Sequence, residues 1–108
     1  MPTALPTLLA RYFAATNRHD VHTVITLFSD TAVVKDEGNE HHGIDAIRQW
    51  AEEAIRKYDF KVEPTGITEA GGKTVVTGMV SGTFPGSPLQ LQHAFSFDRE
   101  KISRLEIG

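Results

Sequence analysis

The sequence predicts one α+β domain in which three N-terminal helices pack on one face of a curved antiparallel β-sheet. Two observations carry this prediction. Up to residue 58, apolar residues recur mostly at three- and four-residue steps, the period of an amphipathic helix. Beyond residue 58, alternating and β-branched segments are separated by hairpin-length turns, which is typical of antiparallel strands. The 108 residues hold no linker or repeat, so we expect a single domain over residues 1–108.

Two helices are expected at the start of the chain. The first begins near Thr3 or Pro6 and ends before residues 17–19. Its apolar stripe consists of Leu5, Leu8, Leu9, Tyr12, Phe13 and Thr16. Asp20 is the expected N-cap of the second, short helix, because its carboxylate can accept a backbone N–H of the first turn. That helix carries Val21, Val24, Ile25 and Phe28 and ends at residues 29–30.

A hairpin and a third helix complete the first half. Residues 31–36 are rich in β-branched side chains and predict a strand with Val34 and Asp36 on one face. Residues 37–40 are typical of a hairpin turn, after which His41 and His42 form a short return strand. The third helix is predicted over residues 44–57. Its stripe consists of Ile44, Ile47, Trp50, Ala51, Ala54, Ile55 and Tyr58.

Four strands follow, over residues 60–69, 73–84, 89–98 and 101–107, with turn residues between them. The strand over 89–98 alternates between two kinds of side chain. We expect its larger set to face the helices: Leu89, Leu91, His93, Phe95 and Phe97. Its other face carries small or uncharged residues, namely Gln90, Gln92, Ala94 and Ser96, and one face of the strand over 73–84 carries Val75, Thr77 and Met79. Such a face favours cover by a second sheet, so a homodimer through the sheet is expected.

Composition excludes several classes of function. The net charge is −3 and no basic block occurs, which argues against nucleic acid as a partner. The chain has no cysteine, so disulfides, thiolate metal sites and cysteine nucleophiles are excluded. No apolar stretch is long enough to span a membrane, and residues 1–6 do not have the pattern of a signal peptide. We therefore expect a cytoplasmic protein that binds neither nucleic acid nor membrane.

Three polar residues lie on faces that are expected to point inward: Tyr12, Asp36 and His93. Each has an ordinary explanation. Tyr12 can be a core residue with a bonded hydroxyl, Asp36 can bond the backbone of the turn that follows it, and His93 can be a core histidine. A catalytic function requires the three side chains to converge, which sequence spacing cannot establish.

The other histidines give no distinctive metal-ligand spacing. His41 and His42 are adjacent and so point to opposite faces of a strand. Either one could form half of a site with Glu40 or Asp36, but nothing in the pattern favours this, and we expect no metal and no cofactor.

Three segments, residues 8–20, 27–36 and 43–50, carry a family pattern. Its fixed points are Tyr12, Asn17 and Asp20, then Leu27, Phe28, Ala32, Val33, Val34 and Asp36, then Gly43, Ala46, Ile47 and Trp50. In these segments the chain resembles the NTF2-like superfamily, and it is similar to the SnoaL-like and ketosteroid-isomerase-like branches. The resemblance covers about the first half of the chain well, and Phe95 and Phe97 extend it loosely to the end.

The resemblance implies a cone-shaped fold with three helices, a strongly bent sheet, a deep apolar pocket and usually a homodimer. It places Tyr12 where the isomerases have a tyrosine that donates a hydrogen bond to the substrate oxygen. Asp36 falls at the position of the carboxylate that moves the proton. His93 departs from the pattern, because the isomerases have a protonated aspartic acid there. A neutral imidazole donates one N–H, an imidazolium donates more strongly, and histidine can also act as acid or base near neutral pH.

We therefore expect a pocket that performs proton transfer on a small apolar carbonyl compound, as in an isomerase, dehydratase or cyclase. The candidate catalytic residues are Tyr12, Asp36 and His93. The expected ligand-binding residues are Val34, Trp50, Leu91, Phe95 and Phe97. Two alternatives are a non-catalytic module that sequesters an apolar ligand and a dimerisation module whose pocket is packed shut. A cavity below roughly 300 Å³ would favour the last of these.

Overall fold

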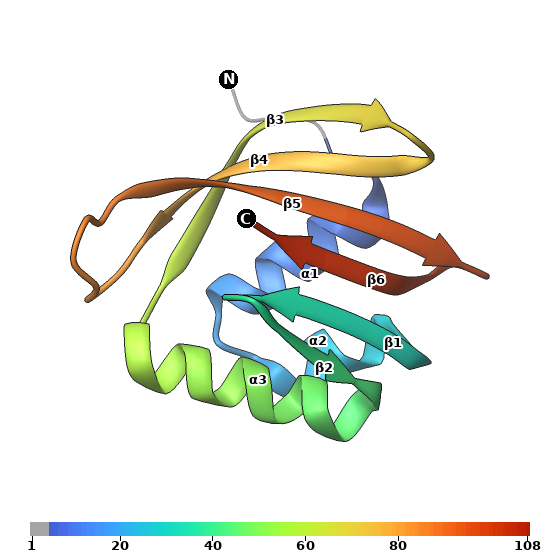
Figure 1. The fold of residues 1–108 in the computed structure, drawn as a ribbon, viewed down its shortest axis with the longest axis horizontal. Helices are drawn as coiled ribbons and strands as arrows, with labels where there is room; N and C mark the ends of the chain where they lie inside the picture. The colour runs from blue at the N-terminus through green and yellow to red at the C-terminus, as the bar shows by residue number, and fades with distance from the viewer. Residues whose placement is uncertain (1–4) are drawn as a thin grey trace.

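Three helices flank a six-stranded sheet in the computed structural model of the chain, which describes residues 5–108 (Figure 1). In chain order the elements are α1 (Thr7–Asn17), α2 (Val21–Thr26), β1 (Phe28–Asp36), β2 (Asn39–His42), α3 (Gly43–Tyr58), β3 (Lys61–Ala70), β4 (Lys73–Ser81), β5 (Leu89–Asp98) and β6 (Lys101–Ile107). The predicted α+β class is confirmed, and the predicted hairpin of β1 with β2 is present.

The sheet is mixed rather than wholly antiparallel. Its strand order is β2-β1-β6-β5-β4-β3, and β1 runs parallel to β6 while the other neighbours are antiparallel. The antiparallel prediction is therefore wrong for this one pair. Short links fix the direction only of strands that are consecutive in the chain, and β1 is separated from β6 by a helix and four strands. The strong curvature expected from the sequence stays a prediction.

The ends of the first two helices follow local hydrogen bonding. Helix α1 begins after Pro6. The alternative start near Thr3 lies outside the described residues, as do residues 1–4 of the segment that was compared with a signal peptide. Asp20 caps α2 as predicted, because its Oδ1 accepts the backbone N–H of Thr23 at 3.2 Å. Phe28 does not extend α2, contrary to the prediction. It begins β1 instead, where it pairs with Ile102 of β6, so tertiary pairing ends the helix two residues earlier.

Strand β4 ends at Ser81, three residues before the predicted end at Phe84. The chain leaves the sheet there because the next residues bond to the end of α3. The backbone N–H of Thr83 donates to the carbonyl oxygen of Tyr58 at 2.8 Å, and its hydroxyl donates to the same oxygen at 3.1 Å. The loop between β4 and β5 is thereby held against the C-terminus of α3, where it borders the site described below.

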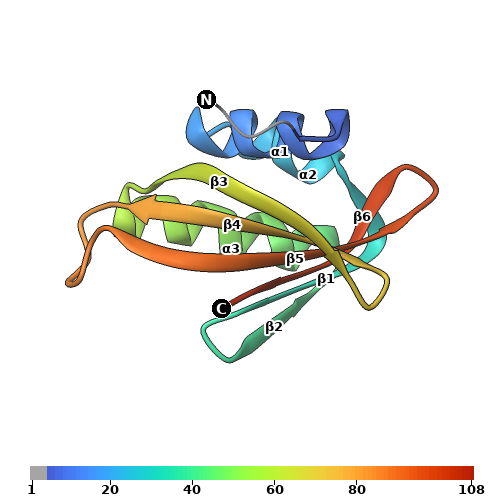
Figure 2. The ribbon, with the colours of Figure 1, turned by 90° about the horizontal axis from the view of Figure 1, so that it is seen from above.

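The helices cover one side of the sheet. Helix α3 packs on β1 and β2, α1 contacts β3, and α2 joins α1 to α3 (Figures 1 and 2). The centre of the core is aromatic: the ring of Tyr12 meets those of Phe13, Phe28 and Phe95 edge-on, with centroids 5.1, 6.0 and 5.4 Å apart.

No helix within residues 5–108 has the length and hydropathy needed to cross a membrane. The expected cytoplasmic location stays a prediction.

Asn17 ties the end of α1 to the start of β3. Its side-chain Nδ2 donates to the carbonyl oxygen of Val62 at 2.8 Å, and its Oδ1 accepts the backbone N–H of the same residue at 2.7 Å. Lys61 adds a hydrogen bond of 3.0 Å from Nζ to the carbonyl oxygen of Asn17. The amide therefore satisfies the edge of β3 as a neighbouring strand would and fixes α1 beside the sheet.

The helix-facing side of β5 is covered only in part. His93 and Phe95 are buried as predicted, and Leu91 is half-buried. Leu89 and Phe97, at the two ends of the strand, are 47% and 41% exposed in the single chain. The alternation of the sequence identifies the correct face, but it does not indicate how far the helices extend along the strand.

Candidate ligand-binding and catalytic site

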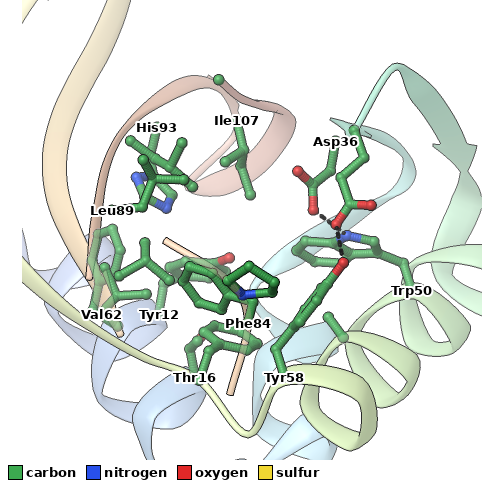
Figure 3. A pocket seen from close by; sticks show the side chains of 18 residues that line it. Tyr12, Thr16, Asp36, Trp50, Tyr58, Val62, Phe84, Leu89, His93 and Ile107 are labelled. Carbon is green, nitrogen blue, oxygen red and sulfur yellow. Dashed lines mark hydrogen bonds between the residues drawn. The ribbon is translucent and has the colours of Figure 1, made fainter. Parts of the chain in front are cut away.

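A cavity of about 560 Å³ lies between the helices and the inner face of the sheet (Figure 3). Its walls come from α1, the end of β1, α3, the strands β3 to β5 and the C-terminal end of the chain. Six aromatic side chains contribute: Tyr12, Phe13, Trp50, Tyr58, Phe60 and Phe84. The volume lies within the ordinary range of small-molecule sites, which disfavours the alternative of a pocket packed shut.

Asp36 is the last residue of β1, and its carboxylate borders the cavity. The indole Nε1–H of Trp50, on α3, donates a hydrogen bond of 3.0 Å to Oδ2 of Asp36. Half-burial raises the pKa of Asp36, because removal from water disfavours the charged form, and the charge of Glu37 acts in the same direction. The hydrogen bond from Trp50 opposes this shift. The result is an oriented carboxylate that is more basic than an exposed one.

Tyr12 lies on the inner face of α1 and is buried. Burial raises the pKa of its phenol; the hydroxyl of Thr16 lowers it, and the negative charge of Asp36 raises it further. Tyr12 is therefore protonated at neutral pH and can donate a hydrogen bond. In Figure 3 it lies between the Asp36 side of the cavity and the His93 side.

His93 is only 3% exposed, and its ring contacts that of Phe13 edge-on at 5.5 Å. Burial lowers the pKa of His93 to about 4, although backbone groups of Val76 and Leu91 partly oppose the shift. The imidazole is therefore neutral at pH 7, with one ring nitrogen as an N–H donor and the other as an acceptor. Nδ1 has no hydrogen-bond partner within residues 5–108.

Gly78, which pairs with Leu91 across β4 and β5 while His93 pairs with Val76, makes room for this ring. A Cβ at residue 78 would lie 3.2 Å from Cε1 of His93 and 2.7 Å from Cγ1 of Val62. Real Cβ atoms essentially never approach a neighbour as closely as the second distance. The absence of a side chain at Gly78 therefore leaves the space that the ring of His93 and the methyl groups of Val62 occupy.

All three candidate catalytic residues line the same cavity. Of the expected ligand-binding residues, Trp50 and Leu91 also line it, whereas Val34, Phe95 and Phe97 do not. Val34 and Phe95 are completely buried in the core, and Phe97 stacks on Phe95 near the exposed end of β5. The sequence pattern identifies inward-facing residues, but it does not separate those that fill the core from those that border empty space.

One polar pair at the border of the cavity was not predicted from the sequence. The hydroxyl of Tyr58, in the last turn of α3, donates a hydrogen bond of 3.1 Å to Oε1 of Glu37, in the turn after β1. The ring of Tyr58 also contacts that of Phe84 edge-on at 5.7 Å. Tyr58 belonged to the predicted apolar stripe of the helix, so its inward position had a signal. Glu37 had none, because an acidic turn residue is usually solvated.

The described residues contain no cluster of three histidine, aspartate or glutamate side chains arranged to hold a metal ion. His42 bonds to Glu40 at 3.1 Å, and Glu40 also pairs with Arg104 at 3.2 Å, away from the cavity. The polar side chains that line the cavity can themselves donate and accept hydrogen bonds, and the Asp36 carboxylate can accept a proton.

The family model described as the SnoaL-like domain matches residues 9–105. The chain belongs to the SnoaL-like family. The resemblance seen in the sequence is thereby confirmed, and with it the NTF2-like, ketosteroid-isomerase-like fold. This SnoaL-like domain has no match among curated proteins.

Solved structures agree with this assignment. A Sinorhizobium meliloti protein described as a "putative polyketide cyclase" is 38% identical with a TM-score of 0.92, and the match covers 96% of this chain and 95% of that one. A Catenulispora acidiphila protein with a ketosteroid isomerase-like fold, solved with trimethylamine, is 18% identical with a TM-score of 0.84 over 97% and 86% of the two chains. SalBIII, an epoxide hydrolase/cyclase-like enzyme with a role in pyran ring formation in the polyether salinomycin, is 18% identical with a TM-score of 0.77 over 93% and 85% of the two chains. The last two likenesses establish the fold alone.

Proposed function

We propose that this SnoaL-like domain catalyses proton transfer at the carbon beside a carbonyl group of an apolar small molecule. The observation that supports this most directly is the Asp36 carboxylate, which borders an aromatic cavity, is oriented by Trp50 and has a raised pKa. A carboxylate of this kind is a suitable general base, because its basicity is increased while its geometry is fixed.

In the proposed reaction, Asp36 removes a proton from the α-carbon of the ligand. The electron pair of the broken C–H bond forms the enolate, whose negative charge develops on the carbonyl oxygen. Tyr12 donates its hydroxyl hydrogen bond to that oxygen and stabilises the charge, which is more effective in a cavity with few waters than in solvent. The protonated Asp36 then returns the proton to the product, and the carboxylate is regenerated.

His93 is proposed as a second hydrogen-bond donor to the oxygen or to another polar group of the ligand. Because its pKa is lowered to about 4, the ring donates as neutral imidazole rather than as imidazolium. The same shift makes His93 a poor acid or base near neutral pH. Acid–base work therefore falls to Asp36 alone.

The enolate can react in two ways. The likeness to the Sinorhizobium meliloti protein described as a "putative polyketide cyclase" supports cyclisation as the reaction here. In a cyclisation, the enolate carbon forms a C–C bond to a second carbonyl carbon of the same ligand. The oxygen of that second carbonyl then takes the proton from Asp36. In an isomerisation, the proton returns instead to a different carbon of the conjugated system, and no C–C bond forms.

A non-catalytic ligand-binding module is the second candidate. The neutral state of His93 favours it, since only one of the three candidate residues can move a proton near neutral pH. The two functions differ in turnover and not in affinity. A binding module would retain an apolar ligand without exchanging its hydrogens.

Deuterium exchange tests the proposal with simple ketones and does not require the natural substrate. Apolar ketones such as 2-tetralone would be incubated with the protein in D2O, and loss of their α-hydrogen signals would be followed by NMR. We expect exchange faster than with buffer or with a Tyr12→Phe variant. Ketones that bind but exchange at the buffer rate with wild-type protein would favour the binding module and exclude the proposed enzyme.

We also propose that the domain forms a homodimer through the outer face of β4 and β5. This face is nearly free of charge, and pairs such as Val75 with Ala94 and Met79 with Gln90 lie side by side on it. On the same face, the hydroxyl of Thr77 donates a hydrogen bond of 3.0 Å to Oε1 of Gln92. An Ala94→Arg variant is expected to be monomeric in sedimentation equilibrium, whereas a monomeric wild type would exclude this arrangement.

A further inference from the structure

The lining of the cavity is acidic. It includes the carboxylates of Asp36 and Glu37, and no lysine or arginine lines it within residues 5–108. His93 contributes no positive charge near pH 7, because burial keeps the ring neutral. A bound anion would therefore meet two carboxylates and no cation.

Asp36 has no cationic partner within residues 5–108. The ion pairs of the domain lie elsewhere, as in the contacts of Arg104 with Glu40 and Glu106. The side-chain hydrogen bond that Asp36 accepts comes from the neutral indole of Trp50. The charge of His41 lowers the pKa of Asp36, but His41 does not line the cavity, and its ring centroid lies 6.2 Å from that of Trp50. Carboxylates that are partly removed from water gain from a cationic partner, and within residues 5–108 no lysine or arginine forms an ion pair with Asp36.

Aromatic rings surround that carboxylate. Trp50 contacts it directly, and Tyr58 lies on the same side of the cavity (Figure 3). Tyrosine and tryptophan faces attract organic cations through their quadrupoles, and the attraction increases where water is displaced. The ring of Tyr58 already has the ammonium of Lys57 at 5.1 Å from its centroid, and Lys57 is not among the residues that line the cavity.

We propose that the cavity selects its ligands by charge: it binds hydrophobic protonated amines in preference to neutral ligands of the same shape, with the ammonium against Asp36 beside Trp50 and Tyr58, and it excludes carboxylates. The proposal rests on the cavity of the proposed function, but it concerns binding and does not require turnover. If the carbonyl reaction occurs, such amines are competitive inhibitors of it, because the bound ammonium pairs with the Asp36 carboxylate and keeps the ketone away from it. Acidic ligands, such as free carboxylic acids and phosphate esters, are excluded from the substrate class.

Three ligands with one hydrophobic cage test this selectivity: 1-adamantanemethylamine, 1-adamantanemethanol and 1-adamantanecarboxylate. They differ in charge, absorb no light near 280 nm, and can be titrated at pH 7 against the fluorescence of Trp50, the one tryptophan of the chain. We expect the amine to bind about tenfold more tightly than the alcohol, and the carboxylate most weakly. The amine should also inhibit deuterium exchange of a ketone competitively.

Two variants locate the effect. Asp36→Asn keeps the size of the side chain and an acceptor for Trp50, so it should reduce the amine-to-alcohol ratio of affinities to about one while alcohol binding is nearly unchanged. Glu52→Gln removes one charge from the exposed surface of α3 and should leave the ratio as in wild type. Calorimetry provides a second readout of all affinities.

An amine that binds no more tightly than the alcohol, or a preference that survives in Asp36→Asn, would overturn the proposal. Failure of all three ligands to bind would overturn it as well, since the cavity would then not accept the cage. Amine selectivity without any ketone exchange would instead leave this inference standing and reject the catalytic function. Ketone exchange without amine selectivity would support the catalytic function and reject this inference.

Discussion

The indole Nε1 of Trp50 lies 3.0 Å from Oδ2 of Asp36 and donates a hydrogen bond to it, which joins the middle of α3 to the last residue of β1. The contact fixes one carboxylate oxygen and thereby orients the other. It also lowers the pKa of Asp36 against the effect of half-burial. The geometry and the basicity of the proposed base therefore depend on a residue that does not itself exchange protons.

A Trp50→Phe variant keeps an aromatic ring and loses the N–H donor. We expect kcat for ketone exchange to fall about tenfold with little change in KM, because the carboxylate is less well oriented. The pKa of Asp36 should rise, since a group that stabilised the charged form is gone. The acidic limb of the pH–rate profile should therefore move to higher pH. A profile that keeps its wild-type position would contradict this role for Trp50.

His93 should make stability depend on pH. Its pKa is about 4 in the folded chain, below the ordinary histidine value of 6.5, so the unfolded state binds the proton more readily. This contribution is complete above pH 6.5 and is lost as the pH falls toward 4, by about 3 kcal/mol in total. The free energy of unfolding, measured in urea at several pH values, gives the loss.

Two histidine variants isolate that contribution. His93→Gln should have a smaller loss of stability between pH 6.5 and pH 4 than wild type, because the buried titrating group is absent. His22→Gln removes an exposed histidine of α2 and should retain the wild-type slope. Equal slopes in wild type and His93→Gln would show that the ring is not protected from protonation by burial.

Gly78→Ala should destabilise the domain by about 1–3 kcal/mol, because the added Cβ would lie 2.7 Å from Cγ1 of Val62 and 3.2 Å from Cε1 of His93. Displacement of His93 should also weaken ligand binding. Gly66→Ala is the matched control on β3, where the nearest atom to the added Cβ is 3.9 Å away. Urea denaturation of the two variants gives the comparison, and similar losses in both would indicate a general effect of replacing a strand glycine.

Asn17→Ala should cost about 1–3 kcal/mol of stability, since it leaves both the N–H and the carbonyl of Val62 without their partner. Asn39→Ala removes an exposed amide with one long hydrogen bond of 3.4 Å and should be nearly neutral. Thermal and urea unfolding of the two variants measure the difference. An Asn17→Ala variant as stable as Asn39→Ala would mean that water replaces both bonds.

Local chemistry made much of the fold predictable. The Asp20 cap, the helix over residues 44–57 and the alternation around His93 and Phe95 each follow from interactions between near neighbours in the chain. The errors have a common cause in long-range contacts. Phe28 leaves α2 to pair with Ile102, and β1 lies parallel to β6, neither of which has a local signal.

The site divides in the same way. The inward positions of Tyr12, Asp36 and His93 were expected from periodicity, and the family resemblance singled them out. Which large side chains fill the core and which border the cavity depends on where the helices end and how the rings pack. Phe97 was therefore expected at the site and Glu37 was not, although the second borders the cavity and the first does not.

The most direct measurement of the proposed function is the rate of ketone α-hydrogen exchange by Asp36→Asn at ligand saturation. If Asp36 is the base, the rate should fall by at least about 100-fold from wild type, while the affinity for the uncharged ketone changes little. The Glu52→Gln variant should exchange at the wild-type rate. An Asp36→Asn variant that binds the ketone and exchanges it as fast as wild type would contradict the account.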